Sequence, residues 1–272
     1  MQCRKIKQKN SQTLLTNLYI CAIIVVPNER EEIIKMVTHI DRRKAYYLMI
    51  DTETANSSTD GKVDRTNALC YDIGFAVIDK KGNIYESYSF VVDEIFFGMA
   101  DIMASAYYAD KIPKYLEDIA DGNRTVANFY EIRATIKMMI EKYQIVAVVA
   151  HNALFDYSAT NATQRYITKS KYRYFFPYGT VFYDTLKMAQ DTICKQKSYQ
   201  SFCFANGYVT KHKTPRPKAT AEIIYKYITG QHEFSESHTG LEDVLIETKI
   251  FAHCMRQHKK MRKNLFQNVE KF

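Results

Sequence analysis

The stretch AYYLMIDTET, residues 45–54, joins a short apolar run to two acidic residues that stand two positions apart. An apolar run that ends at a polar residue is typical of a buried central strand. Side chains two positions apart on a strand project to the same face, so Asp51 and Glu53 are expected side by side. Two like charges held together are costly unless a cation neutralises them. The stretch therefore predicts a cation-dependent site at the end of a central strand.

Two β-rich segments follow, at residues 71–79 and 84–92. The turn residues 80–83, Lys-Lys-Gly-Asn, join them and predict a hairpin. With residues 45–50 these segments form three consecutive antiparallel strands. The polar residues 52–67 are expected to be a loop.

Helices and short strands alternate in the rest of the chain. Apolar residues recur every three or four positions from Val126 to Tyr143, the pattern of an amphipathic helix laid on a sheet. Residues 96–119 indicate irregular helical structure, interrupted by Asp-Gly-Asn at 121–123. The remaining predicted elements are strands at 145–150 and 181–183, and helices from 154 onward and at 185–191, 199–206, 219–229 and 240–256.

Two further acidic residues lie near predicted helix starts. Asn152 is a natural N-cap after the strand at 145–150, which places Asp156 about one turn inside the next helix. Thr239 and Glu242 form a capping-box pattern, which places Asp243 one turn inside its helix and His238 just before the cap. Each aspartate could simply complement its helix dipole, so neither is a functional signal alone.

Taken in order, these residues resemble the motifs of the DEDDh exonuclease family of the ribonuclease H-like superfamily, which includes proofreading epsilon subunits, ribonuclease T and oligoribonuclease. The resemblance extends from about Tyr46 to His253 and implies an α/β fold: a ribonuclease H-like mixed sheet, three antiparallel strands followed by parallel strands, flanked by helices. The matching segments are Ile50–Thr54, His151–Asp156, His238–Asp243 and, for an Asp-Thr-Leu-x-x-Ala motif, Tyr183–Ala189.

The resemblance also implies a chemistry. It assigns two divalent ions, Mg²⁺ or Mn²⁺, to four carboxylates, and hard oxygen ligands suit these ions. His238 is the expected general base. The implied reaction is 3′-to-5′ hydrolysis of DNA, at single-stranded or frayed 3′ ends, to nucleoside 5′-monophosphates. The expected metal ligands are Asp51, Glu53, Asp156 and Asp243, of which Asp51 would bridge both ions. The expected substrate-binding residues are Thr52, Thr54, His151, Asn152 and Phe155.

Two alternatives stay open from the sequence. One is an exoribonuclease or oligoribonuclease acting on RNA, because these enzymes share the metal-site residues. The other is a non-catalytic nucleic-acid-binding or polymerase-interaction module, although the intact set of five motif residues disfavours it. A replication or repair polymerase is a candidate partner.

The charge distribution points to a polyanion. The net charge is +8, and residues 165–263 hold 18 Lys and Arg against 8 Asp and Glu. A proline-stiffened basic loop spans Lys211–Lys218. Lys and Arg also alternate with aromatic residues in 165–176, as in a strand-binding surface or, equally, a solvated helix end.

The ends of the chain and its cysteines set the expected organisation. The basic start and the apolar run at residues 18–26 resemble a signal peptide. That run has nine residues, far fewer than the roughly 20 needed to span a bilayer. No membrane association is therefore expected. The six cysteines show no Cys-x-x-Cys spacing, which favours reduced thiols and a cytoplasmic protein. The lack of partnered ligand spacing also argues against a metal site at His212 or His253–Cys254. The expected parts are an N-terminal extension (1–44, with Met36 as an alternative start), an exonuclease domain (45–258) with insertions at 55–67 and 96–121, and a basic tail (259–272).

Overall fold

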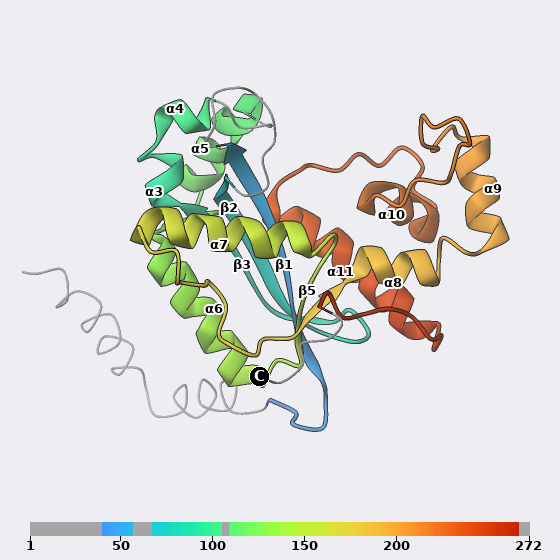
Figure 1. Ribbon diagram of the computed structural model, residues 1–272, viewed down its shortest axis with the longest axis horizontal. Coiled ribbons are helices and arrows are strands. Elements are labelled where there is room, and N and C mark those ends of the chain that lie inside the picture. The colour runs from blue at the N-terminus through green and yellow to red at the C-terminus, as the bar shows by residue number, and fades with distance from the viewer. Residues whose placement is uncertain (1–39, 57–66, 105–108, 267–272) are drawn as a thin grey trace, which may run out of the picture. The chain divides into compact units, whose positions relative to one another are not determined.

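The computed structural model describes residues 40–56, 67–104 and 109–266. A six-stranded sheet with the strand order β4-β3-β2-β1-β5-β6 forms the centre of the unit that begins at Lys44 (Figure 1). Nearly all of the predicted N-terminal extension lies outside the described residues, and the boundaries proposed for the parts of the chain stay predictions.

The sheet is mixed, as predicted. The first three strands are consecutive and antiparallel, β5 pairs parallel with β1, and β6 pairs parallel with β5. The edge strand β4 pairs parallel with β3 and was not predicted, because three residues are too short to show a periodic pattern. The strands are β1 (Tyr46–Asn56), β2 (Ala68–Asp79), β3 (Ile84–Val92), β4 (Thr125–Ala127), β5 (Ala147–Ala150) and β6 (Phe182–Asp184).

The first strand is longer than predicted. A loop was expected from residue 52, but β1 continues to Asn56, which pairs with Ala68 of β2. Main-chain hydrogen bonding to a neighbouring strand does not require apolar side chains, so the polar composition was misleading. Thr52 and Ala55 are in fact buried. Of the insertion proposed at 55–67, residues 57–66 lie outside the described residues.

Ten helical segments lie within the described residues and surround the sheet. The bounds predicted for α8 and α11 are confirmed, and the irregular helical region at 96–119 consists of short pieces. None of the helices in the described ranges is long and apolar enough to cross a membrane. The helical segments are α3 (Asp93–Phe96), α4 (Ala100–Met103), η1 (Ala109–Lys111), α5 (Ile112–Ala120), α6 (Phe129–Tyr143), α7 (Leu154–Thr168), α8 (Thr185–Asp191), α9 (Lys197–Ala205), α10 (Ala221–Thr229) and α11 (Gly240–Arg256).

The alternation of side chains along β1 decides which helices face the acidic pair. Tyr47 and Met49 belong to a core cluster with buried residues of α8, α9, α10 and α11. Tyr46, on the opposite face, contacts the ring of Tyr143 in α6. Because side chains alternate, Asp51 and Glu53 lie on the α11 face of the sheet.

The residues after α11 return to the edge of the sheet. The backbone N–H of Asp184 donates to the carbonyl oxygen of Lys263 at 2.8 Å, and that of Leu265 donates to Phe182 at 2.9 Å. Arg262 pairs with Asp191 of α8 at 2.8 Å. The described part of the predicted basic tail is therefore attached to β6 and α8.

Candidate active site

A cleft of about 990 Å³ opens where β5 ends beside β1. Its walls come from β1, the start of α7, α8, the segment before α11, the first turns of α11, Thr210 and residues 216–221. All ten residues that the sequence nominated line this cleft: Asp51, Thr52, Glu53, Thr54, His151, Asn152, Phe155, Asp156, His238 and Asp243.

Three of the four predicted metal ligands form a tight cluster. One carboxylate oxygen from each of Asp51, Glu53 and Asp243 lies within 4.8 Å of the other two. Asp51 and Glu53 come from one face of β1, and Asp243 comes from the first turn of α11, which packs on that face. The cluster therefore depends on how closely α11 approaches the sheet.

Two glycines permit that approach. Gly74 of β2 is the register partner of Asp51, and Gly240 is the first residue of α11. A Cβ at Gly74 would lie 2.1 Å from the carbonyl carbon of Gly240, and one at Gly240 would lie 2.6 Å from the backbone nitrogen of Gly74. The helix start and the strand are thus in direct backbone contact, which no side chain could allow.

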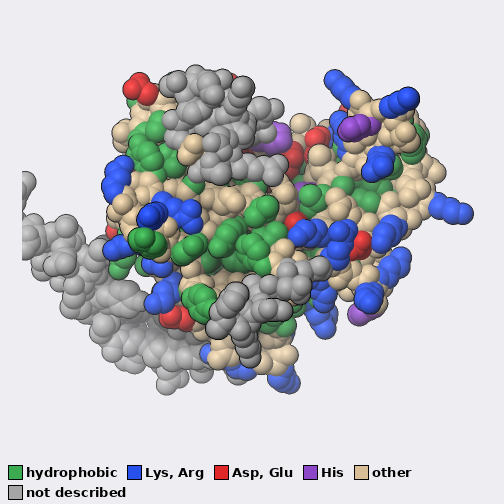
Figure 2. All heavy atoms as spheres, in the orientation of Figure 1, with side chains coloured by type: hydrophobic (Ala, Val, Ile, Leu, Met, Phe, Trp, Pro, Cys, Tyr) green, Lys and Arg blue, Asp and Glu red, His purple; other side chains and the backbone are tan. Residues whose placement is uncertain are grey.

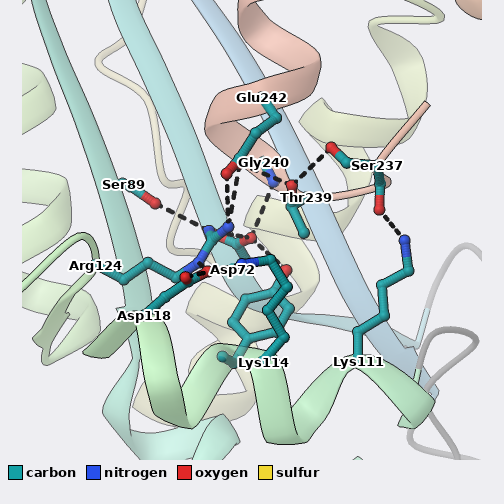
Figure 3. A network of polar contacts seen from close by, with 11 residues as sticks. Asp72, Ser89, Lys111, Lys114, Asp118, Arg124, Ser237, Thr239, Gly240 and Glu242 are labelled. Carbon is teal, nitrogen blue, oxygen red and sulfur yellow. Dashed lines mark hydrogen bonds and ion pairs between the residues drawn. The ribbon is translucent and has the colours of Figure 1, made fainter. Parts of the chain in front are cut away.

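A buried polar network fixes the start of α11 against β2 (Figure 3). Asp72 of β2 accepts from the backbone N–H of Gly240 at 2.9 Å and from Arg124 at 3.2 Å. Arg124 also donates to both carboxylate oxygens of Glu242 at 3.1 Å. The predicted N-cap, Thr239, is confirmed, but the predicted capping-box hydrogen bonds are wrong. The Thr239 hydroxyl donates to the Glu242 carboxylate and makes no cap hydrogen bond. Arg124 and Thr239 both donate to that carboxylate.

Asp156 comes from the opposite side of the cleft. It is buried in the first turn of α7, and its Oδ1 accepts from the hydroxyl of Thr52 at 2.9 Å. The predicted N-cap at Asn152 is wrong, because α7 starts at Leu154 and its cap residue Ala153 makes no side-chain cap bond. Asn152 instead has a positive φ of 65°, and its N–H donates to Asp184 at 3.1 Å. The turn after β5 therefore uses Asn152 to redirect the chain, and Asp156 still reaches the cleft.

Sequence reasoning missed a fifth buried carboxylate, Glu247. It lies on α11 one turn after Asp243, lines the cleft and is 3% exposed. Its Oε2 accepts from the backbone N–H of His151 at 3.1 Å. Among the neighbouring carboxylates, Asp156 raises the pKa of Glu247 most, and Glu247 raises the pKa of Asp51 most. The spacing Asp243-x-x-x-Glu247, which places both on one helix face, was the signal that could have found it.

The electrostatics of the cleft favour bound cations. Burial, together with the neighbouring carboxylates, raises the pKa of Asp51 well above its usual value and that of Glu53 to about 10. Burial also raises the pKa of Asp156 to about 7 and that of Asp243 to about 8. Buried oxygens of Asp51 and Asp243, Oδ2 and Oδ1, have no hydrogen-bond partner among the described residues. Unpartnered oxygens in an all-carboxylate donor set fit Mg²⁺ or Mn²⁺.

His238 stands at the rim of the same cleft. Its side chain is 37% exposed, and its Nδ1 lies 3.8 Å from Oε2 of Glu236. Partial burial and the nearby Lys111 lower the pKa of His238, which favours the neutral imidazole. The residue has a positive φ of 54°, and Lys111 donates to the carbonyl oxygen of the preceding Ser237. The Lys111 hydrogen bond holds the backbone beside His238, which lines the cleft.

The predicted substrate-binding residues divide into two kinds. Thr54, Asn152 and Phe155 line the cleft, and their role in binding substrate stays a prediction. The ring nitrogens of His151 are already engaged, Nδ1 with the Thr185 hydroxyl and Nε2 with the Ala219 carbonyl oxygen, both at 3.0 Å. His151 therefore ties the end of β5 to the far wall of the cleft.

The other suggested sites do not join this cleft. Phe175 and Phe176 are core residues, whereas Tyr172 and Tyr174 are exposed beside Lys171 and Arg165. None of these aromatic residues lines the cleft. Within residues 40–56, 67–104 and 109–266, no cysteine or histidine belongs to a group able to hold a metal ion.

Comparison with known proteins identifies the fold. No protein-family model and no curated protein matches the sequence. A 3′-exonuclease solved for 3′-end-specific recognition of the histone mRNA stem-loop matches with 11% identity and a TM-score of 0.51, over 84% of this chain and 89% of that one. A full-length 3′-exonuclease matches with 11% identity and a TM-score of 0.50, over 84% and 92%.

One further structure is also similar to this chain. The nuclease domain of 3′hExo, a DEDDh family member bound to rAMP, matches with 12% identity and a TM-score of 0.47, over 83% of this chain and 98% of that one. At these identities the first two likenesses show the fold alone. The chain shares the fold of these two 3′-exonucleases, a mixed sheet of three antiparallel strands followed by parallel strands, flanked by helices.

Proposed function

We propose that this protein is a metal-dependent 3′-to-5′ exonuclease that hydrolyses DNA at single-stranded or frayed 3′ ends and releases nucleoside 5′-monophosphates. The observation that carries the proposal is the cluster of Asp51, Glu53 and Asp243, whose oxygens lie within 4.8 Å of one another in the cleft that His238 also lines. Six buried or partly buried acids line one cleft, Glu236 included, and they destabilise the protein unless cations bind there. A role in chemistry explains that cost better than a role in folding.

The carboxylates divide naturally into two groups of ligands. Asp51, Glu53 and Asp243 would hold one divalent ion, and Asp51 with Asp156 would hold a second, with Glu247 close to both of these aspartates. Bound ions would neutralise the acids, activate water and stabilise the leaving 3′ oxygen of the bond that is cleaved. Thr52 orients Asp156 through its 2.9 Å hydrogen bond.

His238 would supply the general base. A neutral imidazole can accept a proton from the attacking water at Nε2, while Nδ1 faces Glu236 at 3.8 Å. Glu236 would then stabilise the imidazolium that forms. Burial raises the pKa of Glu236 to about 7, so proton uptake by His238 favours the ionised form of this neighbour.

End-labelled oligonucleotides test the proposal. The wild-type protein is expected to shorten a 5′-labelled strand from its 3′ end in Mg²⁺ or Mn²⁺ and to stop in chelator. Asp51→Asn should abolish shortening, and Asp121→Asn, at an exposed position after α5, should not. Binding of the strand without any shortening would refute the exonuclease proposal and favour the non-catalytic module.

RNA is the second candidate substrate. One of the structures that share this fold was solved for recognition of an mRNA stem-loop, although only the fold is common to the two chains. Degradation of matched DNA and RNA strands, single- and double-stranded, separates the two substrates. Faster shortening of RNA would assign the protein as an exoribonuclease with the same site.

A further inference from the structure

A short basic arm, residues 208–219, forms the wall of the cleft across from the carboxylates. Its two sides pair like a hairpin, with Thr210 N–H donating to Arg216 at 2.9 Å and Lys218 N–H donating to Tyr208 at 2.9 Å. A bridge between Val209 and Pro217 lies between these bonds. The prolines at 215 and 217 restrict the backbone of the returning side.

The arm is fixed at its base to the residues of the site. The hydroxyl of Tyr199 in α9 donates to the carbonyl oxygen of Lys218 at 2.6 Å. Nε2 of His151 lies 3.0 Å from the carbonyl oxygen of Ala219. The backbone N–H of the same histidine binds Glu247. The arm therefore has a defined position relative to the carboxylate cluster.

Two cations of the arm face the cleft. Arg216 and Lys218 line it together with Thr210 and Pro217, and both cations are exposed. Neither makes an ion pair with a carboxylate of the part of the chain that the structure describes. Figure 2 shows that Lys and Arg side chains also gather over the region of α8, α9 and the arm. The cleft thus has an acidic floor and a basic wall.

We propose that Arg216 and Lys218 bind phosphates of the nucleic-acid strand on the 5′ side of the bond that is cleaved. This inference rests on the proposed exonuclease function. An acidic floor suits cations and the reacting phosphate, whereas phosphates farther along the strand need cationic side chains. A strand that enters with its 3′ end at Asp51 must continue out of the cleft, and the arm is the cationic wall that borders it. Contacts of this kind position the strand without reading its sequence.

Paired variants of the arm test the proposal. In Arg216→Gln/Lys218→Gln the two cleft-lining cations are removed, and in the control Lys211→Gln/Lys213→Gln two exposed cations that do not line the cleft are removed. The probes are labelled oligothymidylate and oligouridylate of about 12 nucleotides, in Ca²⁺, followed by fluorescence anisotropy at several salt concentrations. The p-nitrophenyl ester of thymidine 5′-monophosphate, which has no neighbouring phosphate, reports on the chemical step.

Loss of the cleft-lining pair is expected to weaken strand binding about 10- to 100-fold. The slope of log affinity against log salt should become shallower by about 1.4, since each contact with a single strand contributes about 0.7. Ester hydrolysis should be unchanged, and the control should bind like the wild type.

Equal weakening in both variants would overturn the proposal, because it would reflect overall charge. Unchanged binding in the cleft-lining variant would also overturn it. Failure of the wild type to cleave either the ester or a strand would refute the exonuclease function, whereas the anisotropy data would still decide whether the arm binds phosphates.

Discussion

Replacing Gly74 by Ala should reduce catalysis by displacing α11, although Gly74 does not line the cleft. The new Cβ would lie 2.1 Å from the carbonyl carbon of Gly240 and 2.2 Å from the nitrogen of Leu241. Ordinary contact begins near 3.4 Å, so the helix start and β2 must separate by more than 1 Å. Asp243 moves with the helix, whereas Asp51 stays on β1, and a shift of about 1 Å in a reacting group can cost about 100-fold in rate.

Three measurements test whether Gly74→Ala displaces α11. We expect kcat/KM on the p-nitrophenyl ester to fall about 100-fold. We expect the free energy of unfolding in urea to fall by about 1–3 kcal/mol, the cost of an overpacked core position. Titration calorimetry with Mn²⁺ should show weaker binding, because three ligands no longer converge.

Gly179→Ala is the matched control. Gly179 has a positive φ of 83°, which Gly74 does not, but nothing lies within 4 Å of a Cβ placed at Gly179. It should lose about 1–2 kcal/mol of stability from backbone strain and keep its activity. If Gly74→Ala retained wild-type kcat/KM, or if the control lost as much activity, the argument from backbone contact would be refuted.

Three further changes test the site. His238→Ala should lower the cleavage rate about 10²–10⁴-fold and leave strand affinity nearly intact, and unchanged turnover would exclude it as the base. Glu247→Gln should weaken Mn²⁺ binding about 10- to 100-fold in calorimetry, and wild-type affinity would show that this carboxylate does not support the ions. The pKa values of Asp156 and Asp243 are raised to about 7 and about 8 in the folded protein. Without metal, the folded protein therefore keeps protons on these carboxyl groups that the unfolded chain releases near pH 4. The two carboxyl groups contribute their full stability below about pH 4 and lose it as the pH rises to 8. The Tm of the metal-free protein should therefore fall as the pH rises from 4 to 8, and Mg²⁺ should raise the Tm more at pH 8 than at pH 6. An equal increase in Tm with Mg²⁺ at both pH values would contradict this expectation.

Much of the fold could be predicted from local pattern. The apolar run at 46–50, the hairpin turn at 80–83 and the helical spacing of Phe129, Ile132 and Ile136 all reflect burial on one face of an element. The predictions of strand bounds were wrong where hydrogen bonds to a neighbouring strand decide the structure. The polar end of β1 is a strand because β2 supplies its hydrogen bonds, and β4 exists because β3 lies beside it.

The candidate site shows the same division. The order of the acidic motifs nominated Asp51, Glu53, Asp156, His238 and Asp243, and all five line one cleft. The spacing of these residues carried no information about the distance between β1 and α11. That distance depends on Gly74 and Gly240, which are far apart in the sequence and touch only in the folded chain.

The sequence by itself determined the types of element and the residues able to bind cations, because periodicity and residue chemistry are local properties. The tertiary structure alone decided that Glu247 joins the carboxylates, that His151 anchors the basic arm, and that Arg216 and Lys218 face the cleft. These relations depend on contacts between segments that are distant in the chain. Packing of the sheet against α11, and pairing within the arm, create those contacts.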